Sequence, residues 1–337
     1  LLATFNFTLP TSYCSLTMHD PVLTNDWHAV AEVTDLETQN PLPVRLLGED
    51  LVVWEQDGRI MVWKDLCIHR GTKLSMGWLK DGCLVCPYHG WEYAEDGQCM
   101  KIPAHPDKKP PRKASAKVYK HQIKYGLIWV TQGNPEHDIP TFPEWEDDSY
   151  RNIPSGPFKF HAAGPRAIEN FLDVAHFPFV HEGSLGDRAH PEIGPYHAII
   201  DENGVTAAGI EIWQPNPDGT GVGSTVTYTY KVFRPMVAYF IKTKGPSFAA
   251  MYAVCPIDER HSKGWVLMSM NYGFETPAEE IIDFQNKVTG EDIPVVESQR
   301  PELLPLDLQE ELHLRSDRTA IAYRKYLKRL GLTFGTA

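Results

Sequence analysis

Two short segments of this chain each combine one cysteine with one histidine. Cys67 and His69 lie in the first segment, and Cys86 and His89 follow after sixteen intervening residues. Two thiolates and two imidazoles are the ligand set of a [2Fe–2S] cluster in which the histidines hold one iron and the cysteines hold the other. Zinc also binds cysteine and histidine at short spacings, but zinc motifs usually pair like with like. The mixed pairs therefore favour the iron–sulfur cluster.

The residues beside these ligands support the same interpretation. Gly71 follows the first pair and Gly90 follows the second, and we expect both glycines to let the backbone approach the sulfurs closely. Rieske proteins of respiratory chains resemble this arrangement but carry an extra cysteine in each loop, and these cysteines form a disulfide. Thr72 and Tyr88 stand at the matching positions here, so that disulfide cannot form. The pattern is therefore typical of the Rieske domain of an oxygenase.

The composition limits the class of protein. A length of 337 residues predicts two domains, and 42% hydrophobic with 23% charged residues is ordinary for a globular protein. The net charge of −12 argues against nucleic acid and against an anionic membrane surface as partners. No apolar run reaches the length of a membrane span. The cysteines outside the motif show no disulfide spacing, which predicts a reducing, cytoplasmic setting.

Turn signals and apolar patterns divide the chain into four parts. We expect a leader of extra or disordered sequence over 1–21, an all-β Rieske [2Fe–2S] domain over 22–134, a linker over 135–157 and a catalytic domain over 158–337. In the last part, apolar runs with short connections predict an antiparallel sheet accompanied by helices. The predicted fold class is therefore α+β, with a helix-grip-like second domain.

Six large apolar residues on the predicted strands are candidates for the wall of a substrate pocket, although core packing alone would account for each of them. They are Phe233, Phe240, Met251, Tyr252, Met268 and Met270. Mostly apolar walls of this kind favour a small ring compound as the ligand.

An iron–sulfur cluster transfers electrons, and a second group of polar residues indicates which reaction would use them. Asn170, Asp173 and His176 recur at a spacing of three, which keeps them on neighbouring faces of a helix. His181 lies five residues after His176, but Pro178 disrupts the helix and lets the chain turn back, so the two imidazoles can converge on one ion. Iron(II) oxygenases use two histidines and one carboxylate and leave positions open for O₂. Packing or solvent contact at a helix end is the alternative for both histidines.

The carboxylate ligand must come from elsewhere in the chain. Asp292 is our first choice, because helical spacing makes it the lone carboxylate in an apolar face. Pro294 cannot donate a helical hydrogen bond, so we expect the helix to be kinked or interrupted beside Asp292. Glu291 and Glu297 are expected to point to solvent. Asp283 is the second choice, and a helix N-cap is the alternative role for Asp292.

Together the two motifs resemble the catalytic (alpha) subunit of Rieske non-heme iron oxygenases. The likeness runs from Trp27 to the C-terminal helix. Length and linker resemble the branch that holds vanillate O-demethylase, dicamba monooxygenase and the saxitoxin-pathway hydroxylases. Four segments are most similar to the last group: His176–Gly183, Leu185–Asp187, Ile139–Trp145 and Ser316–Arg318.

The resemblance implies two cofactors, a [2Fe–2S] cluster and a mononuclear Fe(II). His176, His181 and Asp292 would hold the mononuclear iron, and Asn170 would lie near it. Electrons from a flavin/iron–sulfur reductase or a ferredoxin would pass through the cluster to this iron. The outcome would be hydroxylation or oxidative demethylation of a small, ring-containing organic substrate by O₂.

The resemblance also implies a role for Asp173 between subunits. Its counterpart bridges a cluster histidine of one subunit, here His89 or else His69, to an iron-ligand histidine of the next. A head-to-tail ring, commonly a homotrimer, is therefore implied. The physical reason does not depend on the family, because a carboxylate that accepts N–H bonds from two ligand imidazoles orients both of them.

Other functions stay open at this point. A Rieske electron carrier without oxygen chemistry would hold two irons per chain in place of about three. A zinc-binding interaction module would be colourless. Within the enzyme class, cis-dihydroxylation is the alternative, although such enzymes often have a longer α chain and a separate β subunit.

Overall fold

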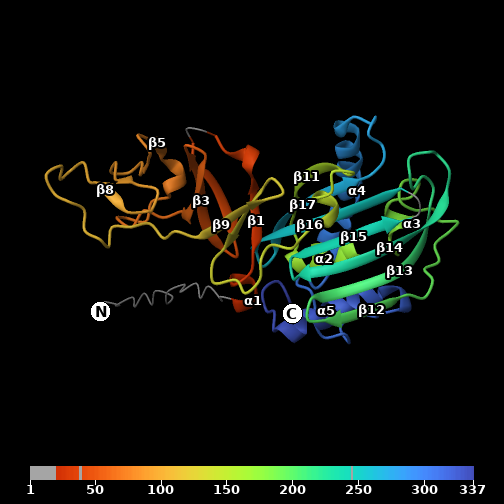
Figure 1. The fold of residues 1–337 in the computed structure, drawn as a ribbon. Helices are drawn as coiled ribbons and strands as arrows, with labels where there is room; N and C mark the ends of the chain where they lie inside the picture. The colour runs from red at the N-terminus through yellow and green to blue at the C-terminus, as the bar shows by residue number, and fades with distance from the viewer. Residues whose placement is uncertain (1–19, 38–39, 244–245) are drawn as a thin grey trace, which may run out of the picture.

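The computed structural model describes residues 20–37, 40–243 and 246–337. The leader predicted over 1–21 lies outside the described residues except for its last two. Strands dominate both halves of the chain, and the helices gather in the second half (Figure 1). No helix in the described ranges is both long and apolar enough to cross a membrane.

The first half is built from three small antiparallel sheets and the short helix α1 (Pro21–Thr24). The strand orders are β1–β10–β9, β2–β3–β4 and β5–β6–β7–β8. The strands are β1 (His28–Glu32), β2 (Leu42–Leu46), β3 (Glu49–Gln56), β4 (Arg59–Lys64), β5 (Trp78–Lys80), β6 (Cys83–Val85), β7 (Glu92–Tyr93), β8 (Cys99–Lys101), β9 (Lys120–Lys124) and β10 (Leu127–Thr131). Single 3₁₀ turns stand at η1 (Val33–Asp35), η2 (Leu74–Met76) and η3 (Pro143–Trp145).

The β3–β4 hairpin separates two cores. Its turn, Asp57 and Gly58, has positive φ at both residues, the geometry that suits the twist of a two-residue hairpin. Side chains alternate across a strand, so Val52 and Trp54 pack with the buried cluster cysteines. The neighbouring Val53 packs in the core that joins the two halves of the chain. The hairpin therefore gives the cysteine loops a rigid backing.

The second half is one seven-stranded antiparallel sheet in the order β11–β17–β16–β15–β14–β13–β12. The strands are β11 (Arg151–Phe160), β12 (His197–Asp201), β13 (Gly204–Gln214), β14 (Ser224–Arg234), β15 (Val237–Thr243), β16 (Ser247–Asp258) and β17 (His261–Met270). The helices are α2 (Gly164–Leu172), α3 (Phe177–Val180), α4 (Ala278–Ser298) and α5 (Arg318–Leu330), with the 3₁₀ turn η4 (Arg315–Asp317) before α5.

The central strands of this sheet are buried on both faces. On β16, Tyr252 and Val254 pack with the helices, whereas Met251 and Ala253 pack with the first half of the chain. The same alternation divides the six apolar pocket candidates. Four of them line the cavity: Phe240, Tyr252, Met268 and Met270. Met251 and Phe233 belong to the core on the opposite face, so their proposed place in the pocket wall is wrong.

The predicted α+β fold, with an all-β first half followed by an antiparallel sheet and helices, is confirmed. The predicted interruption beside Asp292 is wrong, because α4 continues through Pro294 to Ser298. A proline inside a helix removes one hydrogen bond at its own position, and the remaining bonds of α4 hold the helix together.

Candidate metal centres and substrate pocket

Cys67 and Cys86 begin two loops with the same backbone hydrogen-bond pattern. In each loop, the cysteine N–H donates to the carbonyl of the fifth residue after it, and the cysteine carbonyl accepts from the fourth residue, a glycine. Gly71 and Gly90 have φ values of 73° and 68°, which side chains of L-residues rarely adopt. Space around Gly71 is open to 4 Å, so the backbone angle, and not a close approach to sulfur, requires glycine there.

These loops bring the predicted cluster ligands together. Cys67 and Cys86 are buried, and the rings of His69 and His89 lie 4.5 Å apart between centroids. The Nδ1 atom of His69 is buried without a hydrogen-bond partner among the described residues. Burying an unpaired ring nitrogen is costly, and a bond to iron would satisfy it. The donor set therefore fits a [2Fe–2S] cluster held by two thiolates and two imidazoles.

Two aromatic residues complete the surroundings of the cluster site. Trp91 stacks on His69 with centroids 4.5 Å apart and planes at 9°. The Tyr93 hydroxyl lies 3.1 Å from Cys67 Sγ and donates to that sulfur when it is a thiolate. Burial raises the pKa of Tyr93, so the phenol keeps its proton. The sequence interpretation missed Tyr93, since nothing in the spacing shows that β7 passes behind Cys67.

The second site begins where α2 ends. Asp173 is the C-cap of α2, and His176 is the N-cap of the short α3, which His181 follows. The chain therefore breaks before Pro178, and this proline stands in the first turn of α3, where its missing N–H costs nothing. The turn back that lets the two imidazoles converge exists, but Pro178 starts a new helix and does not end the old one.

His176, His181 and Asp292 point their ligand atoms at one another. The two Nε2 atoms are 3.2 Å apart, and Asp292 Oδ1 lies 3.4 Å from Nε2 of His176 and 3.1 Å from Nε2 of His181. Ligands about 2.1 Å from a metal ion are separated by about 3.0 Å at right angles and about 3.4 Å at the tetrahedral angle. The three atoms therefore have the spacing of ligands that surround one ion. Asp283, the second choice, is not part of this group.

Asp173 and Asn170 lie directly behind the ligands. Asp173 Oδ2 is 3.1 Å from His176 Nδ1, and its Oδ1 accepts the Ala175 N–H at 2.9 Å. The Asp173 side chain is still 35% exposed, so it can accept a further donor. Asn170 Nδ2 donates to Asp292 Oδ1 at 3.3 Å. Both residues are therefore placed to orient ligands.

Glu291 is a site residue that the sequence interpretation misplaced. Its Oε2 lies 2.8 Å from His181 Nδ1, so the prediction that it points to solvent is wrong. Glu297 is also engaged, because its Oε1 accepts the His161 backbone N–H at 2.8 Å. The prediction used only the spacing of residues along α4, whereas His181, which meets Glu291, follows α3. A signal was present, since a ligand histidine normally has an acceptor on its second nitrogen and the sequence interpretation assigned none to His181.

The surrounding charges favour a cation between the ligands. Burial lowers the pKa of His176, but hydrogen bonds to Asp173 and Asp292 and the charges of both carboxylates outweigh burial and raise it to about 9. Burial raises the pKa of Asp292, but hydrogen bonds to both histidines outweigh that effect and lower it to about 2. A proton therefore occupies the site at neutral pH when no metal is bound, and a metal ion would replace it.

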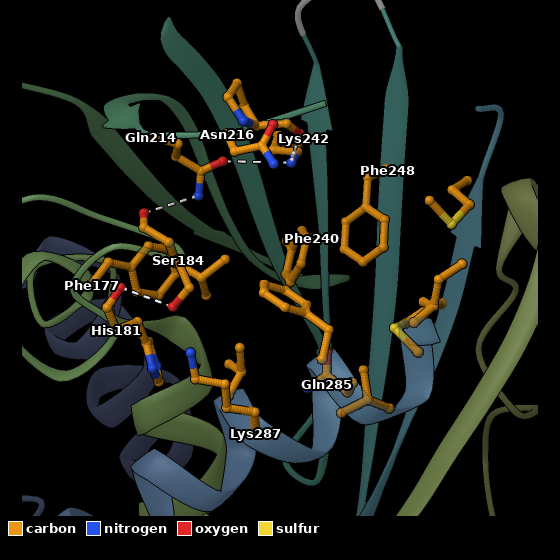
Figure 2. A pocket seen from close by; sticks show the side chains of 18 of the residues that line it. Phe177, His181, Ser184, Gln214, Asn216, Phe240, Lys242, Phe248, Gln285 and Lys287 are labelled. Atoms are coloured by element: carbon orange, nitrogen blue, oxygen red, sulfur yellow. Dashed lines mark hydrogen bonds between the residues drawn. The ribbon is translucent and has the colours of Figure 1, made fainter. Parts of the chain in front are cut away.

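A cavity of about 960 Å³ opens beside these ligands. His176, His181 and Asp292 form part of its wall, and the inner face of the sheet supplies aromatic and methionine side chains. Figure 2 shows Gln214, Asn216 and Lys242 gathered at one side of the cavity, with His181 at another side and Phe240 between them. The cavity is therefore mostly apolar, with a polar group of side chains away from the ligands.

The two candidate centres lie toward opposite ends of the folded molecule. The cysteine loops belong to the region of β5 and β8, and α3 lies far from that region, beyond the large sheet (Figure 1). His89 is exposed at the surface, and the neighbouring Ile68 and Tyr88 are 50% and 63% exposed. The cluster end of the chain therefore presents an apolar surface around one ligand.

Comparison with known families supports this description. Residues 26–124 match the family model of the Rieske [2Fe-2S] domain, and residues 160–333 match that of the vanillate O-demethylase oxygenase C-terminal domain. The second match spans 333 − 160 + 1 = 174 of the 337 residues, just over half of the chain. The two matches together include every predicted ligand of both centres.

Individual proteins resemble nearly the whole chain. Methylxanthine N1-demethylase NdmA of Pseudomonas putida is 32% identical over 321 residues, which cover 90% of this chain and 88% of that protein. Vanillate O-demethylase oxygenase subunit of Pseudomonas sp. (strain HR199 / DSM 7063) is 25% identical over 336 residues, with 91% and 94% covered. The solved structure of Pseudomonas putida CBB5 NdmA with caffeine superimposes with a TM-score of 0.78 at 29% identity, over 91% of each chain.

Proposed function

Because the chain belongs to the Rieske non-heme iron oxygenases, we propose that it is the terminal oxygenase component that hydroxylates or oxidatively demethylates a small ring compound. The observation that carries this function is the convergence of His176, His181 and Asp292 at the wall of a large, mostly apolar cavity. When bound, the [2Fe–2S] cluster would supply electrons one at a time and the mononuclear iron would provide the site for O₂ activation.

Each residue of the second centre has a part in holding that iron. Asp173 and Glu291 each accept a hydrogen bond from the Nδ1–H of one ligand histidine. This bond fixes the tautomer in which Nε2 is free to bind metal and holds the ring in place. Asn170 donates to Asp292 and keeps the shared oxygen aimed between the two rings. We assign the electron-accepting role to residues 22–134 and the chemistry to 158–337.

The substrate would occupy the cavity beside these ligands. The apolar walls exclude water and pack against a ring, while the polar side chains around Lys242 orient it. Relatives named for demethylating methylxanthines and vanillate make an N-methyl or O-methyl ring compound the first class to test. Hydroxylation of the methyl group followed by loss of formaldehyde would be the demethylation route.

We also propose a head-to-tail homotrimer. Within one chain the two centres lie toward opposite ends, so electrons would pass from the cluster of one chain to the iron of its neighbour. Asp173 supports this arrangement because it is half-buried, bonded to His176 and still open to a second donor. His89 is exposed and could supply that donor, Asp173 then serving as the bridge between subunits.

The electron donor would be a flavin/iron–sulfur reductase or a ferredoxin. The cluster end is exposed and could meet such a donor. The described cysteines are all free, which supports a cytoplasmic location.

The direct test is anaerobic reconstitution followed by turnover with a surrogate reductase. Methylxanthines and methoxybenzoates would be supplied in turn, and substrate-dependent NADH oxidation, formaldehyde and product mass would be measured. Coupled formaldehyde release from at least one ring compound, with about three irons per chain, is the expected result. A content of about two irons and no substrate-dependent O₂ uptake would instead support a Rieske electron carrier. A cis-diol product would support dihydroxylation.

A further inference from the structure

Lys242 on β15 is a cation buried in the wall of the substrate cavity. Only 9% of the residue is exposed. Its Nζ donates to the Pro217 carbonyl at 2.5 Å and to Gln214 Oε1 at 3.5 Å, and lies 5.5 Å from the centre of the Phe248 ring. An ammonium has three N–H donors, so one donor has no acceptor among the described residues.

The charge of Lys242 is also without a close counter-ion. Among the described residues, no carboxylate oxygen lies within 4.0 Å of Nζ. Asp218, on the loop beyond β13, acts on Lys242 from a greater distance and bonds instead to the Thr220 N–H and hydroxyl. The cavity lining also holds the phenols of Tyr228, Tyr230, Tyr252 and Tyr272, which burial keeps neutral by raising their pKa values. Its remaining titratable residues are Glu280, Lys287 and the three residues His176, His181 and Asp292. Unlike Lys242, Lys287 has a carboxylate partner, because its Nζ lies 3.9 Å from Glu291 Oε1. A buried charge that lacks a partner is costly, so an anionic ligand would relieve it.

Strand geometry places Lys242 at a useful position relative to the iron ligands. Lys242 and Phe240 are two residues apart on β15 and therefore share a face, about 6.8 Å apart along the strand. Phe240 packs against Phe171, with centroids 5.4 Å apart, and Phe171 directly follows Asn170 at the metal site. In Figure 2 the ring of Phe240 stands between His181 and Lys242. Phe240, Lys242 and the metal ligands line one cavity, so a flat ligand resting on Phe240 would share that space with both the lysine and the ligands.

We propose that Lys242 anchors the substrate through a carboxylate group, so that the preferred substrate is an aromatic acid whose ring lies on Phe240 with its oxidised carbon toward the iron. This inference rests on the proposed function and names its substrate class. Gln214 supports the anchor, since its Nε2 donates to the Leu185 carbonyl and to the Tyr228 hydroxyl, and its Oε1 is thereby turned toward Lys242.

The ionisation of Lys242 gives the anchor a pH signature. Burial lowers its pKa to about 8, and the negative charge of Asp218 opposes that effect. The side chain is therefore charged below pH 8 and loses its proton as the pH rises through that value. Affinity for an acid should fall above about pH 8, whereas affinity for a neutral amide should not change.

The test compares acids with uncharged analogues in the iron-loaded oxidised protein. We would measure the Kd of 3- and 4-methoxybenzoate and of the matching methoxybenzamides by calorimetry, from pH 6.5 to 9.5, in the wild type and in Lys242→Met. At least one acid should bind more tightly than its amide. Lys242→Met should weaken that acid by about 10- to 100-fold, leave the amide within about threefold and abolish the loss above pH 8.

Two further variants separate recognition from structure. Lys242→Arg keeps the charge and should retain most of the preference for the acid. Lys231→Met removes a lysine that lies over the Tyr239 ring, on the other face of the sheet. It should change the Kd of neither the acid nor the amide. If Lys242 only anchors the Pro217 loop, Lys242→Met would weaken acid and amide equally.

The inference is overturned if no acid binds more tightly than its amide in the wild type, or if the preference survives in Lys242→Met. The proposed function fails separately. Oxidative turnover of neutral rings without any dependence on Lys242 would leave the oxygenase standing and remove the anchor. Lysine-dependent binding of acids without any O₂ chemistry would support the anchor and remove the proposed oxygenase function.

Discussion

The two metal centres are assembled in different ways. The proposed cluster ligands come from two loops that repeat one backbone hydrogen-bond pattern within a short stretch of chain. The proposed mononuclear site joins the α2–α3 segment to α4, and Asp292 follows His181 by 292 − 181 = 111 residues. Local contacts shape the first centre, whereas the second exists only after the sheet has brought two helices together. Residue spacing therefore describes the first centre well and the second only in part.

The strongest test of whether the two centres are independent is to remove one proposed ligand from each. Asp292→Ala should lower the iron content from about three to about two per chain and leave the visible spectrum of the cluster intact. Cys86→Ser should lower it to about one and bleach that spectrum. Both variants should lose coupled turnover below detection. If either change emptied both centres, the two sites would not be independent.

Asp173→Asn should have the next largest effect. The amide keeps the size of the side chain but loses the charge that holds His176 and that would, in the proposed trimer, hold a donor from the neighbouring chain. We expect both metals to remain and turnover to fall on the order of 100-fold. Rapid mixing of the reduced protein with substrate and O₂ should locate the loss in electron transfer from the cluster. Asp187→Asn, on an exposed loop, is the matched control. Normal transfer in Asp173→Asn would remove the bridging role.

Glu291→Gln tests the support behind His181. Because the amide holds the His181 N–H less strongly, iron affinity should fall by about 10-fold, measured by competition with a chelator. Glu297→Gln changes an acid near the end of the same helix that bonds to the His161 backbone, and it should leave iron affinity unchanged. Equal iron affinities in both variants would show that Glu291 does not support His181.

Tyr93→Phe should give the smallest effect and touch only the cluster. Loss of the hydrogen bond to Cys67 should lower the reduction potential on the order of tens of millivolts, with both metals retained. Spectroelectrochemistry would measure the shift. Tyr125→Phe removes a phenol in the turn between β9 and β10 that bonds to Pro140 and Phe142, and it should leave the potential unchanged. An unshifted potential in Tyr93→Phe would show that the hydroxyl does not act on the sulfur.

The sequence predicted the parts of the sites that depend on local spacing. The two cysteine–histidine pairs, the pair His176 and His181, and the turn between those histidines follow from short-range geometry. Asp292 needed the family resemblance as well, because many carboxylates follow in the chain and spacing alone could not choose among them. Glu291 was misjudged for the same reason, since the atom it meets belongs to a distant element.

The pocket wall shows a different limit. Alternation along β15 and β16 tells which residues share a face, but not which face meets the helices. Phe233 and Met251 were grouped with Phe240 although they lie across the sheet. Irregular pairing, such as the register shift between Val232 and Arg234, also moves residues between faces. Only the assembled sheet decides these positions.

The sheet with two buried faces has a practical consequence for protein engineering. Odd-numbered residues of β16 such as Met251 seat the iron–sulfur half, while their even-numbered neighbours such as Tyr252 shape the reaction chamber. A chimera that borrows its electron-accepting half from a relative must therefore transplant one side of these strands along with it. The cavity-facing side can then be redesigned independently, because each residue of these strands packs on only one face of the sheet.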